Sequence, residues 1–115
     1  MVVELIAERA ADRIFAALAD ATRRDILTRA IDEGQSVSTL ARRYEMSFAA
    51  VQKHVAVLER AELVSKQRQG REQIVRANAG TLRKATALLE AYEQLWIQRA
   101  SQIADIFAGE KGSPA

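Results

Sequence analysis

The sequence predicts a mostly α-helical domain that carries one small β-hairpin. Apolar residues recur at helical spacing along most of the chain, and few glycines and a single proline interrupt them. The stretch around Gly70 differs, because strand-like runs flank a turn there. The chain has 115 residues, the length of one domain, so we expect a folded domain over residues 1–107 and a flexible tail over residues 108–115.

The composition excludes several classes of protein. The chain has no cysteine, which removes disulfides and thiolate metal ligands. No apolar run approaches the roughly 20 residues of a membrane-spanning helix, and the acidic start, with Glu4, Glu8 and Asp12, is unlike a signal peptide. No nucleophile–base pair, metal-ligand cluster or glycine-rich phosphate loop is visible. We therefore expect a cytoplasmic protein without membrane contact that is not an enzyme and carries no cofactor or metal.

The first two helices are predicted over residues 8–18 and 21–31. Asp20 directly precedes the second helix and is a good N-cap residue, and Gly34 closes the loop after it. The apolar residues of the first helix that we expect to face inward are Ile14, Phe15 and Leu18.

Two shorter helices follow, joined by a turn at Glu45-Met46. Either Ser36 or Ser38 can cap the third helix, and Ser47 can cap a fourth helix that runs to about Ala61. Two short helices joined by a tight turn are typical of a helix-turn-helix. The inward residues of the third helix are Val37, Leu40, Ala41 and Tyr44.

A hairpin and a long helix complete the predicted fold. Residues 63–68 and 73–77 flank a turn at Gln69-Gly70, and residues 81–107 form a helix without an internal breaker. Four helices, a β-hairpin and a last helix follow one another in the order of a winged helix-turn-helix, in which the hairpin is the wing.

The excess positive charge lies in the middle third of the chain. Residues 1–36 have a net charge of −2 and residues 77–115 a net charge of zero, whereas residues 37–76 carry eight basic and four acidic side chains, a net charge of +4. A polyanion such as duplex DNA would bind there. A solvated basic face would give the same count, so the pattern within this segment has to decide.

The fourth helix has two faces of different chemistry. Val51, Val55 and Leu58 form an apolar stripe suited to packing. On the opposite stripe, Gln52 can form two hydrogen bonds with adenine, and Lys53 can reach guanine or a phosphate. A solvated face would also be polar, but the capped helix before it and the basic hairpin after it favour a DNA-reading helix. The full opposite stripe consists of Ala49, Gln52, Lys53, Ala56 and Arg60.

Basic residues surround the turn of the hairpin. Lys66, Arg68 and Arg71 lie on either side of Gly70. A wing of this kind would lay Arg68 and Arg71 along phosphates or into the minor groove. The alternative is an exposed hairpin whose charges serve solubility.

Two ring side chains of the fourth helix have alternative roles. His54 is the only histidine, and alone it cannot supply the three or four ligands of a zinc site. It is either a packed or capping side chain or a contact to a phosphate. Phe48 either touches a thymine methyl or packs on the third helix, and we expect it to pack.

Over residues 10–107 the chain resembles the ArsR-type (arsenic-repressor-like) winged-helix regulators of bacteria. The resemblance rests on the order and spacing of loose motifs along nearly the whole chain. Residues 17–27, A-L-A-D-A-T-R-R-D-I-L, are similar to the second-helix signature of that family, residues 37–41, 46–47 and 51–58 to its helix-turn-helix, and residues 63–64 and 68–71 to its wing.

The resemblance implies a homodimer whose interface contains the first and last helices. It also implies that Ser47, Gln52, Lys53 and His54 lie at the DNA. Together with the opposite stripe of the fourth helix and the wing, the predicted DNA-binding residues are Ser47, Ala49, Ala50, Gln52, Lys53, His54, Arg68 and Arg71.

Three departures from the family pattern bear on structure and signalling. Glu62 replaces a common glycine after the fourth helix, so we expect a differently built turn there. Residues 39–43 lack the cysteine pair of metal-sensing members, and the last helix lacks the aspartate and histidine ligands of the alternative metal site. The aromatic-rich segment 92–96 is similar to that of a metal-independent subgroup. The resemblance therefore implies a regulator that does not sense metals.

The last helix carries an apolar stripe with alternating steps of three and four residues, interrupted at Arg99. Such a repeat is typical of a helix that packs on another helix, and the stripe is too broad for a small monomer to cover. Packing within the subunit is the alternative for one edge of it. The predicted dimerisation residues are Ile14, Phe15, Leu88, Leu89, Tyr92, Leu95, Trp96 and Ile103.

These observations predict a homodimeric repressor that binds an inverted-repeat operator in double-stranded DNA. The alternative is a winged-helix protein-interaction module that does not bind DNA specifically. A small-molecule effector that binds between the winged domain and Trp96 also remains open.

Overall fold

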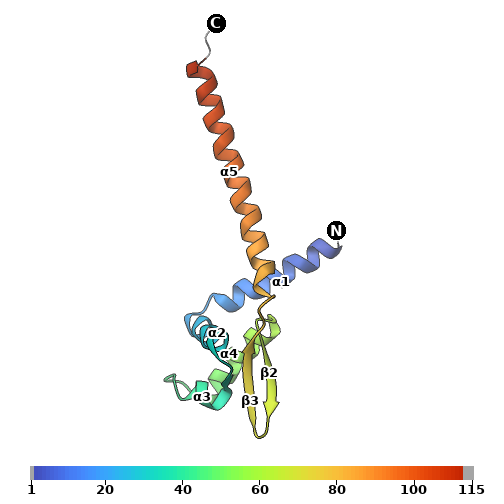
Figure 1. Cartoon of the computed structure of the whole chain (residues 1–115), viewed down its shortest axis with the longest axis vertical. Helices are drawn as coiled ribbons and strands as arrows, with labels where there is room; N and C mark the ends of the chain where they lie inside the picture. The colour runs from blue at the N-terminus through green and yellow to red at the C-terminus, as the bar shows by residue number, and fades with distance from the viewer. Residues whose placement is uncertain (1, 113–115) are drawn as a thin grey trace. The chain divides into compact units, whose positions relative to one another are not determined.

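The structure, a computed structural model, describes residues 2–112 (Figure 1). Their order confirms the predicted winged helix-turn-helix, with a small sheet added to an otherwise helical chain. The chain divides into two compact units, residues 1–85 and 86–115. The elements within the described range are α1 (Val2–Leu18), α2 (Ala21–Asp32), β1 (Gln35–Ser36), α3 (Val37–Ala41), α4 (Phe48–Arg60), β2 (Val64–Gln69), β3 (Glu72–Ala77) and α5 (Leu82–Gly112).

A short turn joins α1 to α2. Asp20 caps α2 as predicted, and its carboxylate accepts a hydrogen bond from the backbone N–H of Arg23 at 3.0 Å. α1 ends at Leu18 as predicted but begins at Val2. It extends beyond the predicted start at Glu8 because no glycine or proline interrupts the residues before it.

The helix-turn-helix consists of α3 and α4, and a serine begins each helix. Ser36 caps α3, because its hydroxyl accepts a hydrogen bond from Thr39 N–H at 3.0 Å. Ser47 caps α4 as predicted and accepts a hydrogen bond from Ala50 N–H at 3.1 Å. Each serine satisfies an N–H that has no partner inside its helix, and so sets where that helix begins.

The wing is the hairpin of β2 and β3, and a third strand joins it. The sheet is antiparallel, with the order β1-β3-β2. The sequence does not predict β1, whose two residues, Gln35 and Ser36, pair with Val75 and Ile74. Two residues are too few to show an alternating pattern. At the tip, Gly70 has a φ of 62°, a left-handed conformation that glycine adopts without strain.

The core of the first unit lies between its helices and the sheet. Ile14 of α1 has no exposed surface, because its whole side chain packs in the core of its own subunit. This corrects the prediction of Ile14 as a dimerisation residue, since a fully buried side chain is not available to a partner. The large side chains that are completely buried are Ile14, Ile26, Leu40, Val51, Val55, Leu58, Leu63, Val64 and Val75.

α4 ends in a Schellman turn that has Glu62 where glycine is usual. The N–H of Leu63 donates to the carbonyl of Leu58 at 3.0 Å, and the N–H of Glu62 donates to the carbonyl of Glu59 at 2.9 Å. Glu62 has a φ of 61°, in the left-handed region. The expectation of a differently built turn is therefore wrong, because the glutamate adopts the conformation that glycine would have.

The second unit is the part of α5 that begins at Thr86. The helix continues past the predicted end at Phe107 to Gly112, so residues 108–112 of the expected tail are helical, and residues 113–115 lie outside the described range. None of the helices within residues 2–112 combines the length and the apolar composition that a membrane span requires. The large apolar side chains exposed along this unit are Leu89, Tyr92, Leu95, Trp96, Ile97, Ile103, Ile106 and Phe107.

Candidate nucleic-acid interface

The helix α4, called the reading helix from here on, turns its predicted stripe to the surface. Val51, Val55 and Leu58 pack into the core, which leaves the opposite side of the helix in solvent. Small residues near the helix start leave the backbone accessible, and Gln52 and Lys53 extend beyond them. Exposed side chains of this face are Ser47, Ala49, Gln52, Lys53 and Arg60, and Ala50 is half-buried.

The wing presents Arg68 and Arg71 at its tip. Both side chains are exposed, and Arg68 Nε donates to the carbonyl of Gly70 at 3.4 Å. Lys66 differs from these two arginines, because its ammonium lies 3.5 Å from Glu59 Oε1 on the reading helix. This ion pair connects the base of the wing to the reading helix. Lys66 therefore pairs with a residue of its own subunit, whereas Arg68 and Arg71 face solvent.

A hollow of about 130 Å³ lies between the reading helix and the wing. Gln52 from the reading helix and Arg71 from the wing both line it, so the structure brings these two predicted DNA-binding residues together. Phe48, which we expect to pack partly buried on α3, is 47% exposed and lines the hollow together with Val37 and Ser38 of α3. The lining residues are Val37, Ser38, Phe48, Gln52, Arg71, Glu72 and Gln73.

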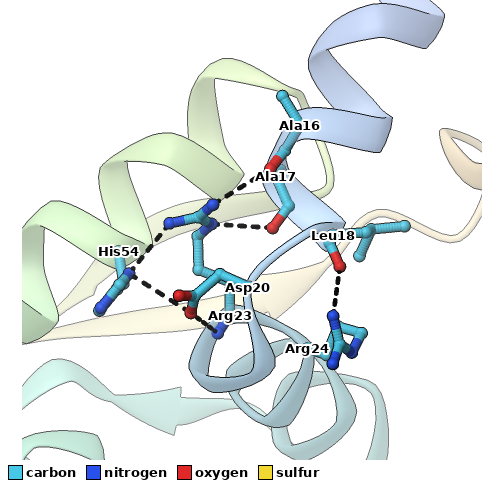
Figure 2. Close-up of polar contacts among 7 residues, drawn as sticks. All are labelled: Ala16, Ala17, Leu18, Asp20, Arg23, Arg24 and His54. Carbon is cyan, nitrogen blue, oxygen red and sulfur yellow. Dashed lines mark hydrogen bonds and ion pairs between the residues drawn. The ribbon is translucent and has the colours of Figure 1, made fainter.

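His54 faces the junction of α1 and α2 (Figure 2). Its Nδ1 lies 3.3 Å from Arg23 Nη1 and 3.9 Å from Asp20 Oδ2. Arg23 also donates to the carbonyls of Ala17 and Ala16. The backbone hydrogen bond from Arg23 is the main reason that the pKa of Asp20 lies below its usual value. His54 is therefore part of a polar cluster that joins α1, α2 and the reading helix.

The two adjacent arginines of α2 cap the end of α1, a role that we did not expect from their place in the sequence. Arg24 Nη1 donates to the carbonyl of Leu18 at 2.7 Å, beside the contacts of Arg23. The last carbonyls of a helix have no partners inside it, and basic side chains can satisfy them. A pair of arginines a few residues after a helix end is the signal that points to this role.

A second polar cluster holds the turn of the helix-turn-helix. The Tyr44 hydroxyl donates to Asp25 Oδ2 in α2, and Arg29 Nε donates to the same oxygen at 2.9 Å. The hydrogen bond from Tyr44, and then that from Arg29, lowers the pKa of Asp25. Burial, together with the hydrogen bond to Asp25, raises the pKa of Tyr44. The sequence predicts that Tyr44 faces inward, but its polar partner follows only from the fold.

The predicted dimerisation residues of α5 are at the surface of their unit. Trp96 is the most exposed of them, at 78%. An apolar stripe of this size is typical of a surface that another molecule covers. Leu89, Tyr92, Leu95, Trp96 and Ile103 are exposed, Leu88 is half-buried, and Phe15 of α1 is half-buried against the core of the first unit.

Within residues 2–112, no group of three or more histidine, aspartate or glutamate side chains is arranged to hold a metal ion. Residues 39–43, where the resembling metal sensors carry cysteines, form the end of α3 and the start of the following turn.

Comparison with known proteins identifies the family. Residues 18–67, from the end of α1 into β2, match the model of the Helix-turn-helix domain family. Among solved structures, the chain is similar to an ArsR-like transcriptional regulator from Rhodococcus sp. RHA1, with 36% sequence identity and a TM-score of 0.77 over 86% of this chain and 93% of that chain. The chain belongs to the ArsR family of transcriptional regulators.

Two further solved structures are similar to this ArsR-family chain. An ArsR family transcriptional regulator is 30% identical, with a TM-score of 0.73 over 77% of this chain and 92% of that chain. A homodimeric winged helix-turn-helix DNA-binding domain from Mycobacterium bovis shares the fold, with 20% identity and a TM-score of 0.64 over 79% of this chain and 85% of that chain. A comparison with curated proteins gave no significant match.

Proposed function

We propose that this ArsR-family regulator is a homodimeric repressor that binds a specific sequence in double-stranded DNA. The observation that carries the proposal is the hollow that Gln52 of the reading helix and Arg71 of the wing line together. A winged helix-turn-helix places its reading helix in the major groove while neighbouring elements contact the backbone. In this chain Gln52, which suits a base, and Arg71, which suits a phosphate, line the same hollow.

The start of the reading helix contacts the bases in this proposal. Gln52 and Lys53 are exposed and can bond base edges. Ala49 and Ala50 are short enough to let the backbone approach the groove. The Ser47 hydroxyl accepts a hydrogen bond from Ala50 N–H, which leaves its own proton available for a phosphate.

The tip of the wing contacts the DNA backbone in this proposal. Arg68 and Arg71 are exposed on both sides of the turn, and arginine matches the geometry of a phosphate with two parallel hydrogen bonds. These contacts fix the register of the protein on the duplex without reading sequence.

A second copy of the chain is the proposed partner of the apolar stripe on α5. The stripe repeats every seven residues, as in helices that pack on one another. The similar domain from Mycobacterium bovis is homodimeric. A twofold dimer presents two reading helices to successive major grooves, so its operator is an inverted repeat. In this proposal the residues that bind DNA and the residues that form the dimer all lie within residues 1–107.

The signal in this proposal is not a metal ion. The chain has no cysteine, and its single histidine is bonded to Arg23. A small-molecule effector fits better, and the first unit has a hollow of about 640 Å³ that Leu27, Ile31, Leu63 and Arg76 help to line. Volumes of this size are typical of small-molecule sites. A candidate compound that releases the protein from the selected duplex, and loses this effect when Ile31 in the hollow is replaced by a charged residue, would identify such an effector.

Selection of random duplexes on the purified protein tests the proposed function. We expect the enriched sequences to share an inverted repeat and the affinity to fall steeply with salt. Transcription in vitro from a promoter that carries the selected site should decrease when the protein is added. If a folded, dimeric protein enriches no sequence, the protein-interaction alternative replaces this proposal. If transcription increases, the role as a repressor is wrong.

The dimer has its own test, with a matched control on the same helix. Trp96→Glu places a charge in the apolar stripe, and Gln94→Glu places the same charge on an exposed residue outside it. We expect sedimentation velocity to show a monomer for Trp96→Glu and a dimer for Gln94→Glu. A dimer in both variants would show that the stripe is not the interface.

A further inference from the structure

Arg23 connects the end of α1 to the reading helix through all three nitrogens of its guanidinium group (Figure 2). Nε donates to the carbonyl of Ala17 at 2.8 Å, and Nη2 donates to the carbonyl of Ala16 at 3.1 Å. Nη1 lies 3.3 Å from Nδ1 of His54. Because its three partners lie on two different helices, the guanidinium group of Arg23 can satisfy all of them in only one position.

The contact with Arg23 sets the tautomer of His54. A guanidinium group only donates hydrogen bonds, so Nδ1 of His54 is the acceptor and the ring proton is on Nε2. Asp20 Oδ2 is 3.9 Å from the same nitrogen, which is beyond hydrogen-bond distance. That carboxylate could pair with Nδ1 only if Nδ1 carried a proton, and Nδ1 could then not accept from Arg23. The shorter contact, to Arg23, therefore determines the orientation of the ring.

The Nε2–H of His54 is a free donor on the flank of the reading helix. His54 follows Val51 by three residues, so it lies roughly 60° around the helix from that buried residue. Its side chain is 23% exposed, and no acceptor for Nε2–H is found within the described part of the chain. The flanks of a helix in the major groove face the phosphates on the walls of the groove.

We propose that Arg23 is a positioning residue for DNA binding: it orients the His54 imidazole so that Nε2–H donates to a DNA phosphate beside the reading helix. This inference rests on the proposed function, because it requires a bound duplex. Arg23 itself does not touch the DNA. Because the same guanidinium holds the last carbonyls of α1, the position of His54 is coupled to that helix.

A double-mutant cycle on the full-length protein tests whether Arg23 acts through His54. Arg23→Lys keeps the charge but cannot bond three acceptors at once. We expect Arg23→Lys and His54→Ala each to weaken binding to the selected duplex by about fivefold to tenfold, the effect of one hydrogen bond. The double variant should bind as weakly as His54→Ala and no weaker. Losses that simply multiply would overturn the proposal.

Arg24→Lys is the matched control for a purely structural role. Arg24 also caps α1, through the carbonyl of Leu18, but it has no contact with His54. We expect Arg24→Lys and Arg23→Lys to lower the Tm alike, and Arg24→Lys to change the Kd for DNA by less than about twofold. An equal loss of DNA affinity in both variants would assign the effect to the end of α1 and overturn the positioning role.

Two substitutions of His54 separate the two ring nitrogens. Glutamine places an N–H close to where Nε2 lies, whereas asparagine keeps an acceptor near Nδ1 and has no donor beyond it. We expect His54→Gln to retain more DNA affinity than His54→Asn. Wild-type affinity in His54→Asn would show that Nε2–H makes no contact with the duplex.

The ring nitrogens also give a direct spectroscopic readout. In ¹⁵N spectra of the free protein we expect a protonated Nε2 and an unprotonated Nδ1, and a mixture of tautomers in Arg23→Lys. A wild-type ring protonated at Nδ1 alone would overturn the proposal. If the tautomer is as expected but no duplex binds, both the proposed function and the phosphate contact fail. If the duplex binds and the cycle shows no coupling, only the positioning role fails.

Discussion

The Tyr44 hydroxyl donates a hydrogen bond to Oδ2 of Asp25 at 2.5 Å, and so joins the turn between α3 and α4 to the middle of α2. Arg29 holds the same oxygen from one helical turn further along α2. The turn itself has no regular hydrogen-bond ladder. The orientation of the reading helix relative to α3 therefore depends on this fixed point as well as on core packing.

Tyr44→Phe should destabilise the protein while leaving the ring in place. Loss of one hydrogen bond should lower the free energy of unfolding, measured by urea denaturation, by about 1 kcal/mol. In an Asp25→Ala background the same substitution should have a much smaller effect, because the acceptor is already gone. Equal losses in both backgrounds would show that the hydroxyl stabilises the turn without Asp25.

Stability should fall at acid pH partly through Asp25. Hydrogen bonds from Tyr44 and Arg29 lower the pKa of Asp25 in the folded protein below its usual value of 3.8. The ionised carboxylate therefore contributes stability above its unfolded pKa, and this contribution is lost as the pH falls through the lower folded pKa. We expect the urea midpoint to decrease from about pH 5 downward, and to decrease less steeply in Asp25→Asn. An identical acid slope in that variant would contradict the assignment.

Glu62→Gly should stabilise the protein. Glu62 has a φ of 61°, and its carbonyl is held there by hydrogen bonds from Asn78 Nδ2 at 2.9 Å and Thr81 Oγ1 at 2.6 Å. A residue with a Cβ is strained in this conformation, so glycine should raise the free energy of unfolding by about 1 kcal/mol. The ion pair of Glu62 with Lys84, at 3.7 Å, is exposed and contributes little.

Glu62→Gln is the control for this prediction, because it keeps the strained backbone and removes the charge. It should change the free energy of unfolding by less than about 0.5 kcal/mol. Equal stabilisation by glycine and glutamine would locate the gain in the lost charge and not in the backbone.

Gln52→Ala and Arg71→Ala should affect DNA binding in different ways. In the proposed complex Gln52 reads a base, so its loss should relax sequence preference at one position of each half-site. In the same complex Arg71 binds a phosphate, so its loss should weaken all sequences alike and reduce the salt slope by about one. Competition binding to the selected duplex and its single-base variants measures both effects. A change of base preference in Arg71→Ala would show that the wing reads sequence.

The helix starts could be predicted because their caps are local. Asp20 and Ser47 each accept a hydrogen bond from the residue three positions later, so a short stretch of sequence contains both partners. β1 could not be predicted, because its two residues become a strand only by pairing with β3, far away in the sequence. Glu62 misled the prediction because the surrounding hydrogen bonds, and not the residue type, set its conformation.

The candidate site could be predicted in part. Helical periodicity shows that Gln52 and Lys53 lie opposite the buried stripe, and the structure places both at the surface. Periodicity also shows that Ile14 faces an apolar neighbour, but it does not tell whether that neighbour belongs to the same subunit. The contact of His54 with Arg23 depends on how α2 packs on the reading helix, which no local pattern contains.

The wing and the reading helix are built on one core, and this has a consequence for genomes that carry the regulator. Val64 and Val75 at the base of the wing are as completely buried as Val55 of the reading helix, and Lys66 pairs with Glu59 at the edge. A close-packed core deforms little. For the proposed complex we therefore expect the number of base pairs between the two contacts of a half-site to be constant from one target promoter to the next.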